Sequence, residues 1–251
     1  MAINRVIVIV SLGRRQDLVR SLVSNLKRFT DMHIIIVSDE SQDFVNDLGV
    51  TVIDVVHSAL QWLDSPRWGV RNCNVLSAKF ALELPVDSCC VLNDDMRVVD
   101  AGFVDGFVLA ERFGVALPMN PRVYVKYNAM GADMSCSPYN PQYEGPAHAP
   151  ACNVSPLFVC RHHDNAMALL NAYLTELQTC MRGTHAMWLA SWKTGITPVY
   201  LPEQWCVCES NAVYIRDYTK VLRGKNHKIE PMMLHWGQSG VRQAFAKETI
   251  V

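Results

Sequence analysis

The sequence predicts an α/β fold built on a mostly parallel, twisted central sheet that is flanked by helices. Two observations support this class. Over the first hundred residues, runs of β-branched side chains alternate with segments of helical periodicity, and each apolar run ends abruptly in polar residues. With 251 residues, of which 50% are hydrophobic and 19% charged, the chain can bury one substantial core. We therefore expect a single domain over residues 1–251.

The first elements follow from short apolar runs. Residues 5–10 are β-branched and stop at Ser11, Leu12 and Gly13, as a strand buried on both faces of a parallel sheet does. Apolar residues from 18 to 29 then recur at helical spacing, and residues 33–37 form a second β-branched run that ends in Ser38 and Asp39. This order predicts a βαβ unit.

The same alternation continues along the chain. Residues 50–56 predict a third strand, residues 74–84 a helix, and residues 89–92 a fourth strand that ends in Asn93, Asp94 and Asp95. A later helix is expected at about 165–181 and a short strand within 195–202, where glycine and proline mark the ends.

The composition changes in the middle of the chain. Six of the twelve prolines lie between Pro121 and Pro156. Because proline restricts φ and lacks an N–H donor, we expect little regular secondary structure there. The segment also carries several tyrosines and asparagines, which favours an ordered substrate surface over a disordered linker.

Charge and cysteine content exclude some function classes. The net charge of −1 argues against general binding to a nucleic-acid backbone, although residues 214–228 carry five bases and one acid. Nine cysteines without a CxxC pair indicate free thiols in a reducing compartment rather than a disulfide framework or a zinc ribbon. No apolar run approaches the length of about 20 residues needed to span a bilayer, so we expect a cytoplasmic protein.

Polar residues follow three of the predicted strands. They are Ser11 with the residues up to 15, then Asp39, and then Asn93 with Asp94 and Asp95. In an open parallel sheet these positions converge beyond the carboxyl ends of the strands, where ligands bind. Two adjacent carboxylates repel each other and need donors or a cation nearby, and Mg²⁺ or Mn²⁺ fits that need. An isolated Asp-Asp pair is more commonly a solvated turn, and that alternative stays open.

In this order, the motifs resemble the GT-A class of nucleotide-sugar glycosyltransferases over nearly the whole chain. The opening strand, helix and acidic turn are similar to those of family-two enzymes, in which an acid matching Asp39 contacts the base. Asn93-Asp94-Asp95 resembles the metal-binding DxD motif with its first acid replaced. The resemblance implies a nucleotide-binding half at 1–117, with Asp95 and Asp94 as metal ligands. It implies further contacts to the donor nucleotide from Ser11, Arg14, Lys79 and Asp94.

The second half, residues 118–251, resembles glycogenin-like enzymes and implies the acceptor side and a closing segment. Residues 151–156 are similar to the turn that passes the donor sugar, which implies a contact from Asn153. Residues 234–238 resemble a terminal HxxG region, which makes His235 the third candidate metal ligand. The basic residues of 214–228, Lys225 among them, are then expected to close over the phosphates.

The resemblance implies a metal-dependent glycosyltransferase that uses Mn²⁺ or Mg²⁺ and moves a sugar from a nucleoside diphosphate, most commonly UDP, to an acceptor. The metal neutralises the departing diphosphate as a Lewis acid. The acidic pair that family-two enzymes place near the acceptor is missing from residues 181–188, so His185 is the candidate general base, with Asp164 and Glu176 as alternatives. Inverting and retaining chemistry both stay open.

Two other functions are consistent with the same residues. A sugar nucleotidyltransferase shares the alternating nucleotide-binding half, but its phosphate loop is rich in glycine, whereas residues 11–15 contain one. A noncatalytic nucleotide- or glycan-binding module would explain the missing acidic pair. The acceptor is open too: a glycan is the first expectation, and a protein, a small metabolite or a modified nucleobase in phage-type DNA are alternatives.

Overall fold

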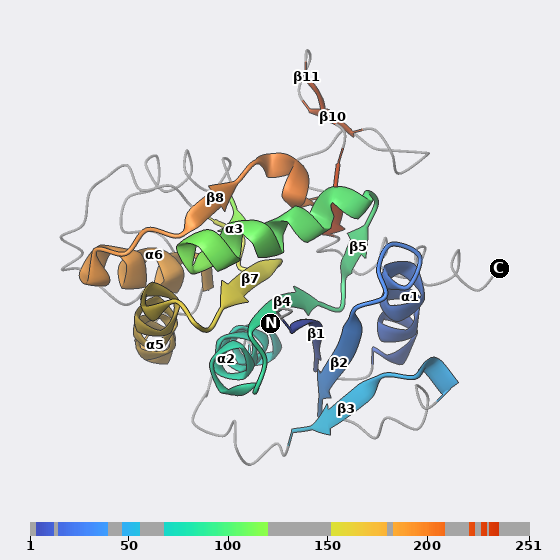
Figure 1. The fold of residues 1–251 in the computed structure, drawn as a ribbon, viewed down its shortest axis with the longest axis horizontal. Helices are drawn as coiled ribbons and strands as arrows, with labels where there is room; N and C mark the ends of the chain where they lie inside the picture. Colours follow the sequence, from blue (N-terminus) through green and yellow to red (C-terminus); the bar gives the residue numbers. More distant parts are fainter. Residues whose placement is uncertain are drawn as a thin grey trace.

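The computed structural model describes residues 4–12, 15–39, 47–55, 68–119, 152–179, 183–208, 221–223, 227–229 and 231–235. Its centre is a seven-stranded sheet with the order β3-β2-β1-β4-β7-β6-β8 (Figure 1). Only β7 runs antiparallel to its neighbours within this sheet. The strands are β1 (Arg5–Ser11), β2 (His33–Ser38), β3 (Thr51–Asp54), β4 (Ser88–Asn93), β6 (Val115–Pro118), β7 (Leu157–Cys160) and β8 (Val199–Leu201).

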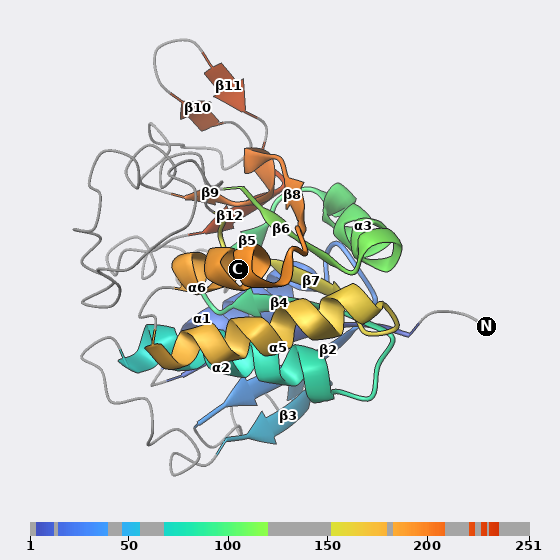
Figure 2. The same ribbon diagram turned by 90° about the vertical axis from the view of Figure 1, so that its left-hand side faces the viewer.

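Helices cover both faces of this sheet. One face packs against α2, α5 and α6, and the other against α1 and α3 (Figures 1 and 2). Along β1, Val8 belongs to the first layer and its neighbours Ile7 and Ile9 to the second, because successive side chains point to opposite faces. This double burial explains the unbroken apolar runs. The helices are α1 (Gln16–Leu26), α2 (Trp68–Glu83), α3 (Asp105–Phe113), α5 (Asp164–Thr179) and α6 (Gly183–Thr194), with short 3₁₀ turns η3 (Ala101–Val104) and η5 (Glu203–Trp205).

A second, three-stranded sheet contains β5 (Met96–Val98), β12 (Met233–His235) and β9 (Val207–Cys208). The central strand, β12, is antiparallel to β5 and parallel to β9. Since β5 begins directly after Asp95, this sheet joins residues 233–235 to the end of β4. A hairpin of β10 (Val221–Arg223) and β11 (His227–Ile229) projects away from the central sheet (Figure 2).

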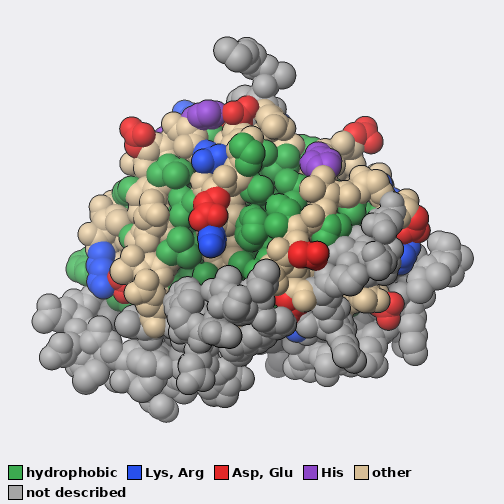
Figure 3. Space-filling view, turned by 90° about the horizontal axis from the view of Figure 1, so that it is seen from below, with side chains coloured by type: hydrophobic (Ala, Val, Ile, Leu, Met, Phe, Trp, Pro, Cys, Tyr) green, Lys and Arg blue, Asp and Glu red, His purple; other side chains and the backbone are tan. Residues whose placement is uncertain are grey.

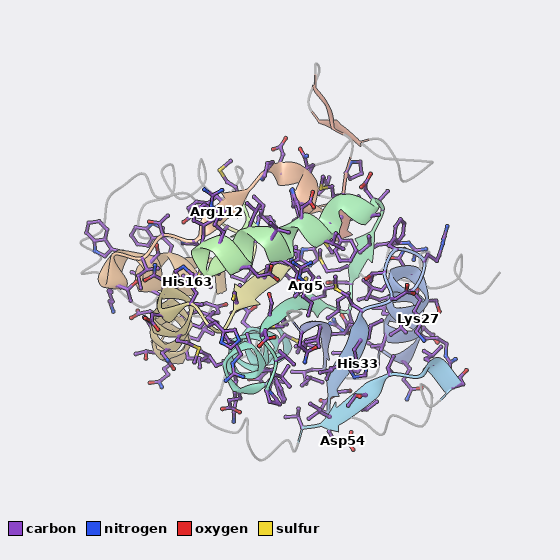
Figure 4. All side chains as sticks on the ribbon, in the orientation of Figure 1. Arg5, Lys27, His33, Asp54, Arg112 and His163 are labelled. Atoms are coloured by element: carbon purple, nitrogen blue, oxygen red, sulfur yellow. The ribbon has the colours of Figure 1, made fainter. Side chains whose placement is uncertain are left out.

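Helix α3 lies close against the central strands. A Cβ atom at Gly106 would come within 2.5–2.7 Å of the Phe158 ring, so only glycine allows this approach. Phe158 in turn makes edge contacts with the rings of Phe107 and Trp205, with centroids 5.3 and 5.7 Å away. Arg5 of β1 reaches Glu111 of α3 through two hydrogen bonds of 2.7 Å, and Figure 4 shows Arg5 beside this helix. Aromatic packing and this ion pair together anchor α3.

The predicted α/β class and the predicted elements are confirmed, with shifted boundaries. Helix α2 begins at Trp68 rather than at 74, and β3 is shorter than the predicted strand. The sequence did not predict β5, α3, β6, β7 and α6, or the short strands β9 to β12. The proline-rich residues 120–151 lie outside the described residues, but a backbone bridge between Met119 and Cys152 brings the two ends of that segment together.

The described surface has a mixed charge pattern on the face seen from below. Hydrophobic side chains occupy its middle, and acidic, basic and histidine side chains are interspersed among and around them (Figure 3). This pattern agrees with the near-zero net charge. Among the helices that the structure describes, none combines the length and apolar character that a membrane span requires.

Asn25 of α1 holds β5 in place, and this contact is testable. Its buried amide accepts from the Val98 N–H at 2.8 Å and donates to the Val98 carbonyl at 3.0 Å. Asn25→Ala leaves both backbone groups without this partner, so we expect the free energy of unfolding to fall by about 2–4 kcal/mol in urea denaturation. Asn171→Ala removes an exposed amide on α5 and should change it by less than about 0.5 kcal/mol. Equal effects of the two substitutions would contradict the role given to Asn25.

Candidate functional site

The polar residues that follow the central strands meet at one edge of the sheet, as predicted. In the parallel register, Ser11 of β1 lies opposite Ser38 of β2, and Val10 lies opposite Asn93 of β4. The residues that follow these strands, Asp39 and Asp94, therefore lie at the same edge as Ser11. This is the carboxyl edge of the parallel strands, where open α/β sheets bind their ligands.

Asp94 is buried and bonded on both of its oxygens. The Ser11 hydroxyl donates to Oδ2 at 2.7 Å, and Arg15 Nη1 donates to Oδ1 at 2.9 Å. Burial raises the pKa of Asp94, and the adjacent Asp95 adds to the increase, although Arg15 and Ser11 oppose it. The Asp94 carboxylate is thus costly to keep ionised and depends on Arg15, whose side chain is 34% exposed.

Asp95 has a different partner. Its Oδ1 lies 3.0 Å from Nε2 of His235, and the Asp95 side chain is 6% exposed. Strand register produces this contact, because His235 of β12 lies directly opposite Met96 of β5, the residue next to Asp95. The two neighbouring acids therefore face different groups from distant parts of the chain.

A turn before β7 and a loop after β8 complete this side of the site. The Asn93 N–H donates to the Ser155 hydroxyl at 2.9 Å, which ties the turn to the end of β4. Within the same turn, Asn153 donates its amide to Cys206 Sγ at 3.3 Å. Cys206 Sγ lies 3.8 Å from Nδ1 of His235. The predicted residues Asn153, Asp95 and His235 thus belong to one contact network.

Cys73 of α2 lies near the acidic residues of the site. Burial raises the pKa of the Cys73 thiol to about 12, and the charges of Asp94, Arg15 and Asp39 also act on it. Cys73 is consequently a neutral thiol beside the acidic residues. Asp39 is partly exposed at the end of β2 and lies near enough to Cys73 to influence its titration.

The pair of Asp95 and His235 fits a divalent cation. Two adjacent ligands of an octahedral ion, each about 2.1 Å from the metal, lie about 3.0 Å apart, which is the observed separation. A carboxylate oxygen combined with an imidazole nitrogen favours Mn²⁺ over Mg²⁺, which prefers oxygen ligands. Within the described parts of the chain, no three His, Cys, Asp or Glu side chains converge on a common point. Because Asp94 is turned to Ser11 and Arg15, its role as a metal ligand stays a prediction.

Comparison with known proteins identifies the fold. No family model and no curated protein matches the sequence. Among solved structures, the galactosyltransferase LgtC in complex with donor and acceptor sugar analogues matches with a TM-score of 0.65 at 11% identity, covering 98% of this chain and 96% of LgtC. An active-site mutant of LgtC matches with a TM-score of 0.63 at 11% identity, over 96% of this chain and 94% of that one.

A third match is the apo structure of the bifunctional glycosyltransferase WbbM, with a TM-score of 0.60 at 9% identity. It covers 100% of this chain and 50% of WbbM. These neighbours are GT-A-type glycosyltransferases. The chain has the GT-A fold. The fold predicted from the sequence motifs is therefore confirmed, and the Asp95–His235 pair lies at the carboxyl edge of a GT-A sheet.

Within the described part of the chain, the remaining predicted site residues are not seen in contact with the acidic residues. Lys79 is exposed on α2, two turns after Cys73. Arg14 and Lys225 lie outside the described residues. His185 lies in the first turn of α6, but its side chain is not described. Their predicted roles stay predictions.

Arg15 is the residue that the sequence reasoning did not select. In the sequence, Arg14 and Arg15 are equivalent neighbours in a loop. The structure gives Arg15 a specific role, because Arg15 immediately precedes α1 and reaches Asp94, whereas Arg14 lies outside the described residues. The one signal in the sequence for this role was position: Arg15 lies at the expected start of a helix, shortly after a strand that ends in Ser11.

The raised pKa of Asp94 predicts a pH dependence of stability. The pKa of Asp94 is higher in the folded state than its ordinary value of 3.8, so the folded protein favours the protonated carboxyl. The stability that the protonated form contributes is therefore lost as the pH rises through the folded-state pKa. Asp94→Asn removes this loss. We expect the unfolding free energy of the variant, minus that of the wild type, to increase as the pH rises from about 4 to 8. Urea denaturation at each pH measures both values. A difference that does not change with pH would contradict the role of burial.

Proposed function

We propose that this protein is a metal-dependent glycosyltransferase that moves a sugar from a nucleoside diphosphate, most simply UDP, to an acceptor. The observation that carries the proposal is the Asp95–His235 pair, 3.0 Å apart at the carboxyl edge of a GT-A sheet with Arg15 close by. That edge supplies both a pair of ligands for a cation and a positive charge for phosphate.

Each side chain has a task in this proposal. Asp95 and His235 would hold the cation, and Mn²⁺ bound there would neutralise the charge of the leaving diphosphate. Arg15 is half-buried against Asp94 and can offer its remaining N–H donors to a phosphate oxygen. Asp39 at the end of β2 would accept hydrogen bonds from the nucleoside. Asn153, from the turn before β7, would border the donor sugar.

The structural neighbours support the choice of substrate class. LgtC was solved with donor and acceptor sugar analogues, and its fold covers almost the whole of this chain. The identity of 11% does not carry residue roles across, so the proposal depends on the geometry of this chain's own side chains. A glycan acceptor, His185 as general base and a cytoplasmic location belong to the same proposal.

Mutation of the cation pair tests this function. We expect the wild-type protein to release UDP from at least one UDP-sugar in the presence of Mn²⁺, and to do so much more slowly after the metal is chelated. Asp95→Asn removes the anionic ligand, and we expect it to lower the rate of release at least about 100-fold. His235→Ala should raise the Mn²⁺ concentration needed for half-maximal rate by about 10–100-fold.

Asp31→Asn is the matched control for the loss of a carboxylate. Asp31 is exposed before β2, at the opposite edge of the sheet, and its substitution should leave the release rate unchanged. Calorimetry with UDP separates the alternatives. Nucleotide binding without any release of UDP would favour a noncatalytic binding module. Wild-type release by Asp95→Asn would exclude the proposed metal site.

A further inference from the structure

A buried thiol, that of Cys206, contacts Nδ1 of the candidate metal ligand His235. The contacts run from the Asn153 amide to Cys206 Sγ at 3.3 Å, from that sulfur to His235 Nδ1 at 3.8 Å, and from His235 Nε2 to Asp95 at 3.0 Å. We propose that Cys206 is a positioning residue whose thiol sets the orientation and tautomer of the His235 ring. The inference rests on the proposed function, because its consequence for activity passes through the cation held by Asp95 and His235.

The chemistry of a thiol suits this place. A thiol can donate and accept one hydrogen bond at the same time. Because the Asn153 amide donates to Cys206 Sγ, the S–H proton is left to donate to Nδ1 of His235. An imidazole that accepts at Nδ1 carries its proton on Nε2, the ring nitrogen that lies 3.0 Å from Asp95 Oδ1. In the proposed arrangement, the thiol therefore selects one tautomer of the metal-free ring.

Cation binding requires the other tautomer, and the same thiol can support it. To ligate a cation, Nε2 would need its lone pair, so the ring proton would be held on Nδ1. Nδ1–H would then donate to the Cys206 sulfur, and the S–H bond would rotate away from the ring. A backbone carbonyl at this position could accept but not donate, and an alkyl group could do neither. Cys206 thus keeps the ring of His235 in one orientation in both states.

The backbone around Cys206 is held on both sides. Its N–H donates to the Glu203 carbonyl at 3.1 Å, and the N–H of Met232 donates to the Gln204 carbonyl at 2.8 Å. Directly after Cys206, β9 pairs in parallel with β12, so that Val207 lies opposite Leu234. Cys206 is 2% exposed, so its thiol is shielded from water. The sulfur also contacts the ring atom that faces away from Asp95, so it cannot ligate the same ion as Nε2.

Mn²⁺ affinity and the histidine tautomer together test this role. We expect Cys206→Ala to bind Mn²⁺ about 10–100-fold more weakly than the wild type by calorimetry, because the ring loses its orienting partner. Cys206→Ser keeps a group that donates and accepts and should recover most of the affinity. Cys160→Ala removes a buried thiol on β7, opposite Ser88 at the start of β4, and should bind Mn²⁺ as the wild type does.

Nitrogen-15 NMR of labelled histidine reads the tautomer without any metal. We expect the His235 ring of the metal-free wild type and of Cys206→Ser to carry its proton on Nε2, and the ring of Cys206→Ala to lose this preference. If Cys206→Ala does not fold, Cys206→Val fills the space without hydrogen bonding and replaces it in both measurements. Unchanged affinity and an unchanged tautomer in these variants would overturn the role of Cys206. Failure of the wild type to bind Mn²⁺ would instead overturn the proposed function, while the tautomer would still test the thiol contact.

Discussion

Two adjacent carboxylates at the end of a buried strand impose the main constraint on this molecule. Asp94 and Asp95 follow β4 directly, both are less than a tenth exposed, and Asp95 adds to the increase that burial causes in the pKa of Asp94. The chain meets this constraint by giving each acid its own partner. Asp94 takes Ser11 and Arg15 from the first βα loop, and Asp95 takes His235 from β12. The arrangement of the site follows from this division of partners.

The same constraint explains why the small sheet exists. His235 can reach Asp95 only if β12 pairs with β5, and β5 is held on its other side by Asn25 of α1. The Asp95–His235 contact is therefore built on backbone pairing between β12 and β5. Rigid support of this kind suits a binding site, because ligands of a cation must be held in place before it arrives. Very different sequences can share the fold, since apolar residues of similar volume can replace one another in the two layers of the core.

The sequence predicted the parallel half of the fold well and the antiparallel part poorly. Doubly buried strands such as β1 and β2 are visible as β-branched runs, because both of their faces need apolar side chains. Strands β5, β9 and β12 have three residues or fewer, which is too short for a periodic pattern. Asp95 and His235 were predicted together through the family resemblance. The pairing of Asp94 with Arg15 was not predicted, because the sequence does not show which of two adjacent arginines has its side chain turned toward the acid.

The sequence alone determined the α/β class, the alternation of the first hundred residues and the edge at which the acids would gather. These properties follow from local patterns of burial and from the rule that parallel strands end at a common edge. Only the tertiary structure decided which partner each acid would take, that Cys206 would lie behind His235, and that β7 would run antiparallel. Those outcomes depend on pairing between segments far apart in the chain, and no local pattern of residues specifies the register of such pairing.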